Sequence, residues 1–208
     1  MNKFLIRAIT IAVVAVALSV PMLATAESTI VTGVGGLTTS ARLDFRVTIP
    51  KVLFLQVGTG TAMGNNATIN LIDFTVPATG MGTGSPVAAT VASGDQGNGV
   101  VTAKVLGNNG IVTLQSTTTG ALGNGAGDTI SYSQISTTAA VLTSAVALPH
   151  PALVDGITTS TTVSPVGKIV NRDAKWTFSF LNSVLAPAGT YGGVNSNNGR
   201  VTYTASMP

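Results

Sequence analysis

Short segments of strand-forming residues, separated by turn residues, follow one another along most of this 208-residue chain. About eight to ten such segments, at roughly ten-residue spacing, lie between Ala41 and Ser206, and Gly, Pro and Asn bound them. Nowhere does a strand pattern alternate with a long helical pattern, which disfavours an α/β fold. The sequence therefore predicts an all-β protein, an antiparallel β-sandwich of the Ig-like or jelly-roll-like kind.

The clearest of these segments is residues 41–49. Apolar side chains occupy every second position from Leu43 to Ile49, and polar side chains stand between them. Alternation with a period of two over this length predicts a strand with one face on the core. Pro50 would end this strand.

Further strands are expected along the rest of the chain. They are residues 52–57, 68–76, 87–91, 100–106, 111–116, 129–132, 166–170, 175–181 and 200–206. The Gly-Asn-Asn-Gly turn at 107–110 predicts a hairpin between its two flanking strands, because Asn and Gly tolerate positive φ. Residues 135–148 are compatible with a strand or a short helix, and their β-branched content favours the strand.

The first 26 residues have the pattern of a secretory signal peptide. Lys3 and Arg7 precede the apolar stretch 8–20, and Ala-Thr-Ala at 24–26 fits the site that signal peptidase cleaves. The apolar stretch would span only about 20 Å as a helix, short of a hydrocarbon core of ~30 Å. We therefore expect cleavage and export to the periplasm, the cell surface or the extracellular space, with no transmembrane segment afterwards.

The remaining chain has the length of one domain. Removing 26 of the 208 residues leaves 182, which suffices for one well-buried core. Residues 27–40 contain three glycines and are expected to be a flexible N-terminal arm or an exchanged strand. Residues 41–208 are expected to form a single β-sandwich domain.

Composition excludes several classes of protein. Loss of Lys3 and Arg7 lowers the net charge from +3 to +1, and only 8% of all residues are charged, so we expect no nucleic-acid partner. There is no cysteine, which excludes disulfides and thiolate metal sites. An apolar content of 45% disfavours intrinsic disorder.

The sequence contains no convincing catalytic constellation. The single histidine, His150, lies between two prolines and is interpreted as a turn residue rather than a general base. Nucleophile-elbow, zinc-protease and phosphate-loop motifs are missing, and no two carboxylates stand out as a pair. We therefore predict no enzyme, no cofactor, and no catalytic, cofactor-binding or metal-binding residues.

Two features of the sequence are compatible with a binding site, but each has a simpler interpretation. Asp95 with Asn98, and Asp128, offer oxygen atoms for calcium, but neither turn has the EF-hand spacing, so turn chemistry is preferred. Trp176 could stack on a sugar. Its spacing from Phe178 and Phe180 predicts a core residue instead, in one core with Phe45, Val47 and Phe54.

The C-terminal part of the chain resembles bacterial surface proteins. Ala-Gly-Thr-Tyr at 188–191, followed by residues 200–208, is similar to the closing hairpin of WxL-type cell-surface domains and of cysteine-free pilin-like subunits. Trp176-Thr177-Phe178 stands where such domains have Trp-x-Leu, and Tyr203-Thr204-Ala205 stands at the second motif. The resemblance covers about the last 35 residues and implies a β-sandwich at the bacterial surface.

These observations predict an exported bacterial surface protein with a structural or adhesive role, such as a subunit of an extracellular fibre. The chain has few charges with which to protect strand edges, and its Thr-, Ser- and Asn-rich strands suit pairing between molecules. Expected partners are further copies or other surface proteins. The alternative is a carbohydrate- or cell-wall-binding module with a polysaccharide partner, which requires an exposed aromatic platform or a polar groove.

Overall fold

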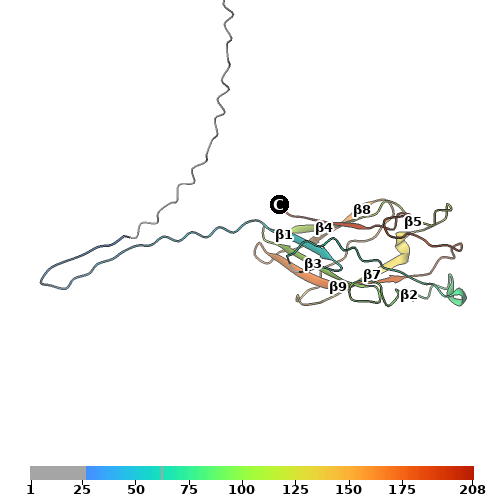
Figure 1. The fold of residues 1–208 in the computed structure, drawn as a ribbon, viewed down its shortest axis with the longest axis horizontal. Helices are drawn as coiled ribbons and strands as arrows, with labels where there is room; N and C mark the ends of the chain where they lie inside the picture. Colours follow the sequence, from blue (N-terminus) through green and yellow to red (C-terminus); the bar gives the residue numbers. More distant parts are fainter. Residues whose placement is uncertain (1–26, 62) are drawn as a thin grey trace, which may run out of the picture. The chain divides into compact units, whose positions relative to one another are not determined.

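The structure is a computed structural model that describes residues 27–61 and 63–208. The predicted signal peptide, residues 1–26, lies outside the described residues. The described part of the chain is nearly all β, with 30% of its residues in strands and 3% in helices, and its antiparallel sheets pack together (Figure 1). The predicted all-β sandwich-like fold is confirmed.

The chain divides into two units, of which the second begins at Pro50. We predicted that the domain begins at Ala41, with residues 41–49 as its first strand. Instead, residues 27–49 contain no strand, and every one of them is exposed. The β-sandwich is therefore the unit Pro50–Pro208.

The larger sheet of this unit is built around one long strand, β9 (Val170–Phe180). Its order is β1-β3-β9, and all pairs are antiparallel. A short strand, β2, and β7 also pair with β9, near its C-terminal end. The bounds of these four strands are Leu53–Val57 for β1, Val87–Ala88 for β2, Val100–Gly107 for β3 and Ile135–Ala140 for β7.

The smaller sheet has the order β10-β4-β8, again antiparallel. Its strands are β4 (Val112–Thr117), β8 (Thr158–Val163) and β10 (Thr202–Ser206). A separate two-stranded hairpin pairs β5 with β6, and two short 3-10 helices complete the unit. Their bounds are Leu122–Gly123 for β5, Thr129–Ile130 for β6, Ala78–Gly80 for η1 and Tyr132–Gln134 for η2.

The predicted hairpin at 107–110 is wrong. β3 pairs with β1 and β9, whereas β4 pairs with β10 and β8, so this turn carries the chain from one sheet to the other. The turn suits this role because Asn108 is fixed to the start of the domain: its amide donates to the Pro50 carbonyl oxygen at 2.7 Å and its Oδ1 accepts from Val52 N at 2.9 Å. Both edges of β3 are occupied by other strands, which leaves none for β4.

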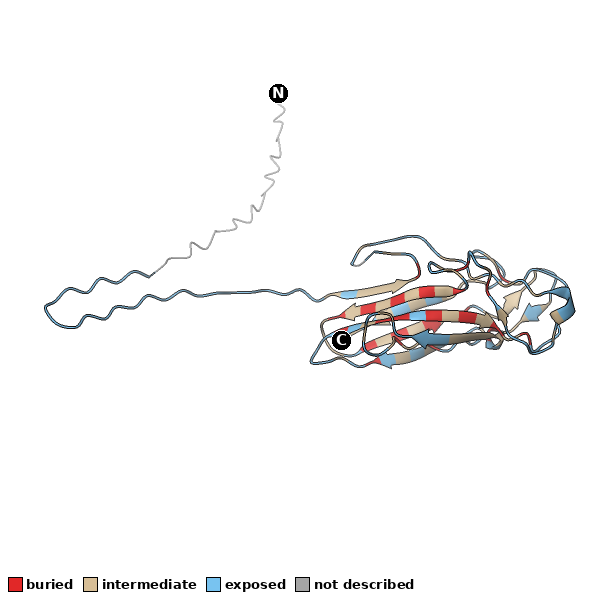
Figure 2. Cartoon of the chain, turned by 90° about the horizontal axis from the view of Figure 1, so that it is seen from below, coloured by how far each residue is buried: buried red, intermediate tan, exposed pale blue. Residues whose placement is uncertain are grey.

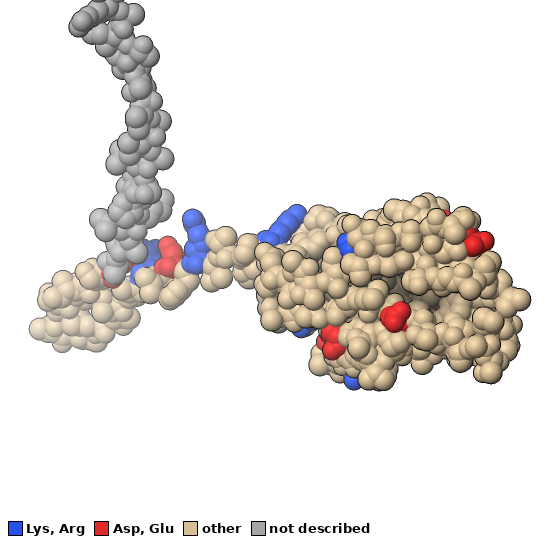
Figure 3. All heavy atoms as spheres, turned by 45° about the vertical axis from the view of Figure 1, so that its right-hand side comes forward, with Lys and Arg blue, Asp and Glu red and all other residues tan. Residues whose placement is uncertain are grey.

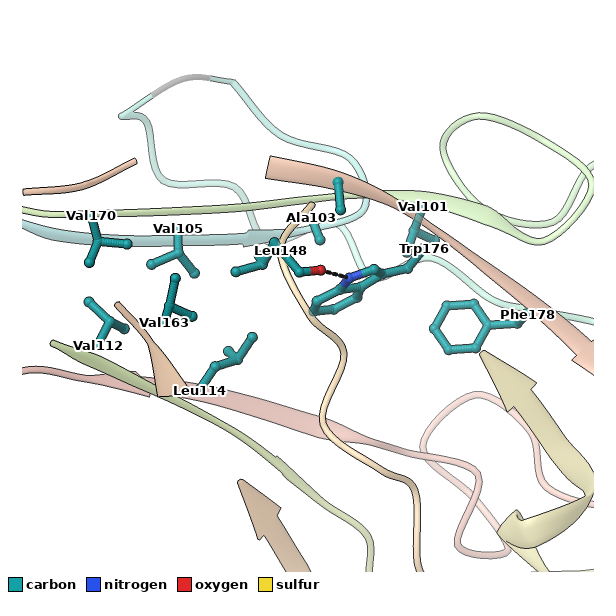
Figure 4. Close-up of a cluster of buried hydrophobic side chains, with 11 residues drawn as sticks. Val101, Ala103, Val105, Val112, Leu114, Leu148, Val163, Val170, Trp176 and Phe178 are labelled. Atoms are coloured by element: carbon teal, nitrogen blue, oxygen red, sulfur yellow. Dashed lines mark hydrogen bonds between the residues drawn. The ribbon is translucent and has the colours of Figure 1, made fainter. Parts of the chain in front are cut away.

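Apolar side chains from both sheets meet in one core (Figure 4). Trp176 is fully buried there, and its indole N–H donates to the Leu148 carbonyl oxygen at 2.8 Å. Phe178 and Phe180 are buried on the same face of β9, as predicted. Figure 2 shows the alternation of buried and less buried residues along the strands of the core. This packing is the basis of the fold, since buried aromatic side chains contribute most per residue.

Three residues predicted for this core lie elsewhere. Phe45 and Val47 are 86% and 83% exposed, and Phe54 is only half-buried and lies outside the core cluster. Phe54 and Leu55 are neighbours on β1 and so lie on opposite faces of the strand. Leu55 is the one that packs against the core. The strand prediction was correct for β1, but the core-facing side of the strand was assigned wrongly.

The domain has two ends, which we define by their residues. At the near end, Pro50–Val52 lie beside Asn108–Gly110 and Pro208: Lys51 Nζ donates to the Pro208 carbonyl oxygen at 3.1 Å, and Asn109 donates to the same atom at 2.6 Å. The turn 166–169 joins them through Gly110 N and the Lys168 carbonyl oxygen, 2.9 Å apart. The far end comprises the segment that follows β9 and the loops around the β5–β6 hairpin.

Candidate functional site

The second edge of β10 is unpaired among the described residues. β10 is the outer strand of its sheet, with β4 as its partner in that sheet. An unpaired edge presents a row of backbone N–H and C=O groups that can bind another strand. In a domain with few charged residues this edge is the first candidate for a binding site.

Residues 68–76 form a second unpaired edge that faces the same space. Two odd-numbered residues, Leu71 and Asp73, form backbone hydrogen bonds on the side away from this space. The Leu71 carbonyl oxygen accepts from Gly94 N at 3.2 Å, and the Asp73 carbonyl oxygen accepts from Thr90 N at 2.8 Å. The backbone groups of Ile72 and Phe74 make no such bonds, while their side chains pack against the core. Residues 68–76 were predicted as a strand. They are extended but form none, because no neighbouring strand pairs with this edge.

An open groove of about 970 Å³ lies between these two edges. Residues 68–76 line one side, and residues 199–203 with the loop 186–195 line the other. The lining includes side chains that belong to the core, and most of these are apolar. They are Leu55, Val57, Val101, Ile135, Leu153, Phe178, Phe180 and Tyr203. A long apolar groove with unpaired backbone on both sides has the chemistry of a site for one extended strand.

The strand order explains why the groove exists. An immunoglobulin-type sandwich has the order A-B-E-D in one sheet and C-F-G in the other. Here β1, β3, β9 and β7 take the places of A, B, E and D, and β4 and β10 take those of C and F. Within residues 50–61 and 63–208 no strand occupies the place of G beside β10. The groove is the place of that strand.

The other unit of the chain contains a segment with the pattern of a strand. Residues 43–49 carry Leu43, Phe45, Val47 and Ile49 at alternate positions, and all four side chains are exposed. Isolated exposed apolar residues are common, but four in strict alternation form a continuous apolar stripe once the segment is extended. The segment therefore has the sequence pattern of a strand but no pairing partner in its own unit.

The part of the arm that precedes this segment is held by polar contacts. Arg42 donates to the Glu27 carboxylate at 2.7 and 2.9 Å, and Thr39 Oγ1 donates to the Thr29 carbonyl oxygen at 2.9 Å. The hydrogen bond from Arg42 lowers the pKa of Glu27 and raises that of Arg42. These contacts fold residues 27–42 back on themselves and leave residues 43–49 outside the loop they form.

His150 is half-buried among aromatic side chains of β9 and β10. Its ring packs edge-on against Trp176, with centroids 4.6 Å apart, and Nε2 lies 2.7 Å from the hydroxyl oxygen of Tyr203 on β10. Burial lowers the His150 pKa to about 4. A neutral imidazole between aromatic rings supports the packing of β10, so His150 is a packing residue rather than the turn residue that the two prolines predicted.

Asp173 on β9 is a buried carboxylate with a structural role. It accepts from Thr143 N at 2.9 Å, from Ser144 N at 2.8 Å and from the Thr143 hydroxyl. Burial alone would raise its pKa, but these hydrogen bonds lower it to about 2. The charged side chain thereby fixes the loop that leads to Leu148, the residue that binds the Trp176 indole.

In the two turns with candidate calcium ligands, the Asp95, Asn124 and Asp128 side chains are used in hydrogen bonds within the protein. Asp95 accepts from Thr102 N at 2.8 Å, and Asn124 Oδ1 accepts from Ala126 N and Asp128 N. Among the described residues no three His, Cys, Asp or Glu side chains are grouped for a metal ion. The same part of the chain has no helix with the length and apolarity to cross a membrane.

Comparison with known proteins gives no assignment. No protein family, no curated protein and no solved structure matches this chain. The groove and the exposed segment therefore have to be interpreted from their own geometry.

Sequence reasoning assigned residues 27–40 to a flexible arm or an exchanged strand and residues 41–49 to the domain, and it did not predict the groove. The available signal was Pro50. It separates the best alternating pattern of the chain from the apolar run at 52–57, and such a break also fits a boundary between an arm and a domain. The groove itself gives no local signal, because it is defined by a strand that the domain lacks.

Proposed function

We propose that this protein is a structural subunit of an extracellular fibre, in which residues 41–49 of one copy fill the groove of the next. The observation that carries the proposal is that two features occur in the same chain. One is a domain that lacks one edge strand, and the other is an unpaired segment with the sequence pattern of a strand. Addition of a strand to an exposed edge is an established mode of protein recognition. The exchanged segment is then 41–49, and residues 27–40 are a leading arm.

The dimensions of the segment and the groove agree. Residues 41–49 and the groove edge 68–76 each contain nine residues, or about 30 Å of extended chain. Alternation places four apolar side chains on one face of the inserted strand, toward the groove floor, and leaves Arg42, Asp44 and Arg46 on the outer face. Burying each large apolar side chain contributes ~1.5–3 kcal/mol. Together with the backbone hydrogen bonds to the two unpaired edges, this burial acts against the cost of ordering the strand.

Chain direction favours insertion between different copies. β10 runs from the far end to the near end, because Thr202 pairs with Thr117 and Ser206 with Thr113. A strand that pairs antiparallel with β10, as in the complete sandwich, therefore runs toward the far end and places Ile49 there. The next residue, Pro50, belongs to the near end of its own domain. A chain cannot satisfy both conditions with its own groove, whereas a second copy can.

The carbohydrate-binding alternative has less support. Trp176, the strongest candidate for a sugar-stacking residue, has an exposed fraction of 0%. The groove floor is formed mainly by aliphatic and Phe side chains. Sugar-binding grooves need open aromatic faces as well as polar groups, and the buried Trp176 offers no such face.

A synthetic peptide of residues 41–49 tests the proposal. Added in excess to the chain that begins at Glu27, the peptide should occupy the groove, raise the thermal stability of the domain and block self-association. At a peptide concentration of 100 Kd, the free energy of unfolding should rise by about 2.7 kcal/mol. Calorimetry and sedimentation velocity measure the two effects.

The matched control is the same peptide with Phe45 and Val47 replaced by Asp. It keeps the length and the outer face, and it should neither stabilise the domain nor block association. Equal effects of both peptides, or no effect of the native one on a chain that does self-associate, would refute strand insertion. Negative-stain microscopy of the assembled protein should show fibres.

A further inference from the structure

The near end of the domain leaves no free linker after the exchanged segment. Pro50 O and Val52 N are both bound to the Asn108 side chain, at 2.7 and 2.9 Å, and Lys51 is bound to Pro208. The domain therefore begins directly where residues 41–49 end. A copy that donates this segment has to bring the near end of its own domain to the point where the segment leaves the acceptor.

That point lies at the far end of the acceptor. The groove lining includes Val184 and Val194, which are both exposed. Both residues belong to the segment that follows β9 at the far end. Leu185 lies next to Val184 and packs beside Gly82, which is held by the Asn182 side chain through a hydrogen bond of 3.0 Å. An antiparallel strand leaves the groove beside these apolar side chains.

We propose that the near end of one copy packs directly against the far end of the next and forms a defined junction with apolar contacts. This inference rests on the proposed strand exchange. Both surfaces carry apolar side chains that the isolated domain leaves in water: Ile111, Val166 and Ile169 at the near end, and Val184, Leu185 and Val194 at the far end. The junction would remove both sets from solvent.

The charges at the two ends are compatible with this contact. Lys51 and Lys168 lie at the near end, whereas Asp128 and Asp155 lie at the far end with Arg200. Figure 3 shows that charged side chains are few and widely separated on the face of the domain in view. The excess is positive at one end and negative at the other, which favours contact between unlike ends over contact between like ends.

Cysteine crosslinking tests the junction, because the natural chain contains no cysteine. Two variants of the chain that begins at Glu27, Val166→Cys and Leu185→Cys, are mixed in equal amounts, allowed to associate and treated with a short bismaleimide. Thr138→Cys, exposed on β7 away from both ends, replaces either variant as the control. Sedimentation velocity before crosslinking measures association independently.

The expected result is a crosslinked dimer that joins position 166 to position 185, with loss of this product when Thr138→Cys replaces either partner. Crosslinks between two copies of Val166→Cys would overturn the junction and indicate contact between like ends. The absence of crosslinks in material that sediments as oligomers would overturn the junction while the proposed function stands. Variants that sediment only as monomers, like the unmodified chain, would overturn both.

Discussion

β9 and residues 41–49 have nearly the same pattern but opposite environments. In β9, Trp176, Phe178 and Phe180 alternate with polar residues, and all three aromatic side chains are buried in the core. In the segment 41–49, Phe45 and Val47 alternate with polar residues in the same way and are more than 80% exposed. Both segments carry the amphipathic pattern of a half-buried strand.

The difference lies in the partners of the two segments. β9 has β3 on one edge and β7 on the other, and a second sheet covers its apolar face. Residues 41–49 have neither a pairing strand nor a covering sheet in their own unit. Alternation therefore predicts that a segment can pair, and it does not identify the molecule that supplies the partner.

The largest expected effect is on the free energy of unfolding, which should depend on β9 but not on residues 41–49. Trp176→Ala should lower the free energy of unfolding by about 3–5 kcal/mol, because it removes a fully buried side chain and leaves the Leu148 carbonyl oxygen without its donor. Phe45→Ala should leave the stability of the isolated chain unchanged. Chemical denaturation of the two variants measures the contrast, and equal destabilisation by both would place Phe45 in the core after all.

The next effect depends on pH and concerns only the domain. The unfolded chain protonates His150 below an ordinary pKa of 6.5, whereas the folded protein resists until about pH 4. The free energy of unfolding should therefore fall by about 3 kcal/mol as the pH falls from about 6.5 to 4. Denaturation at a series of pH values measures this slope.

A His150→Gln variant sharpens this prediction. It should be flat between pH 6.5 and 4, because it lacks the titrating group. The variant should still lose stability between about pH 3.8 and 2. In this range Asp173 is protonated in the unfolded chain but still charged in the folded protein, because its pKa there is lowered. An unchanged slope in the variant would show that His150 is not the group responsible.

A smaller effect is expected on association. Phe45→Ala should weaken self-association by about tenfold to a hundredfold, since the groove loses contact with one large apolar side chain. Arg46→Ser is the matched control, because its side chain is on the outer face of the inserted strand and should change association little. Sedimentation equilibrium gives both constants, and a stronger effect of Arg46→Ser would reverse the assigned face.

The sequence predicts the sandwich well where strands are both amphipathic and paired within the domain. β1, β3, β4 and β10 lie within two residues of expectation at both ends, whereas β9 is one continuous strand from Val170 where two strands, 166–170 and 175–181, were expected. β8 was missed because its Thr-Thr-Ser-Thr-Thr-Val run has no apolar alternation, and its place is set by pairing with β4. Residues 188–191, which resemble part of a closing hairpin in sequence, form no strand.

The candidate site was beyond sequence reasoning for a different reason. Its groove lining comes from segments as distant as Leu55 and Tyr203, and its defining property is the lack of a strand beside β10. Long-range pairing of this kind leaves no pattern in any one segment. Residues 41–49 do carry a visible pattern, and their regular alternation predicts a strand of the domain.

The smallest effect is expected in the leading arm. Glu27→Gln breaks the ion pair with Arg42, which is exposed on both sides. Exposed pairs contribute little, so neither thermal unfolding nor self-association should change measurably. A clear loss of association in this variant would give residues 27–40 a role in assembly that the present account does not assign to them.

The most direct measurement compares two deletions in the chain that begins at Glu27. Sedimentation velocity is recorded for the variant without residues 27–40 and for the variant without residues 41–49, and circular dichroism confirms that both domains are folded. The account predicts that the first variant self-associates like the full chain and that the second is a folded monomer. Association of the variant without residues 41–49 would contradict it.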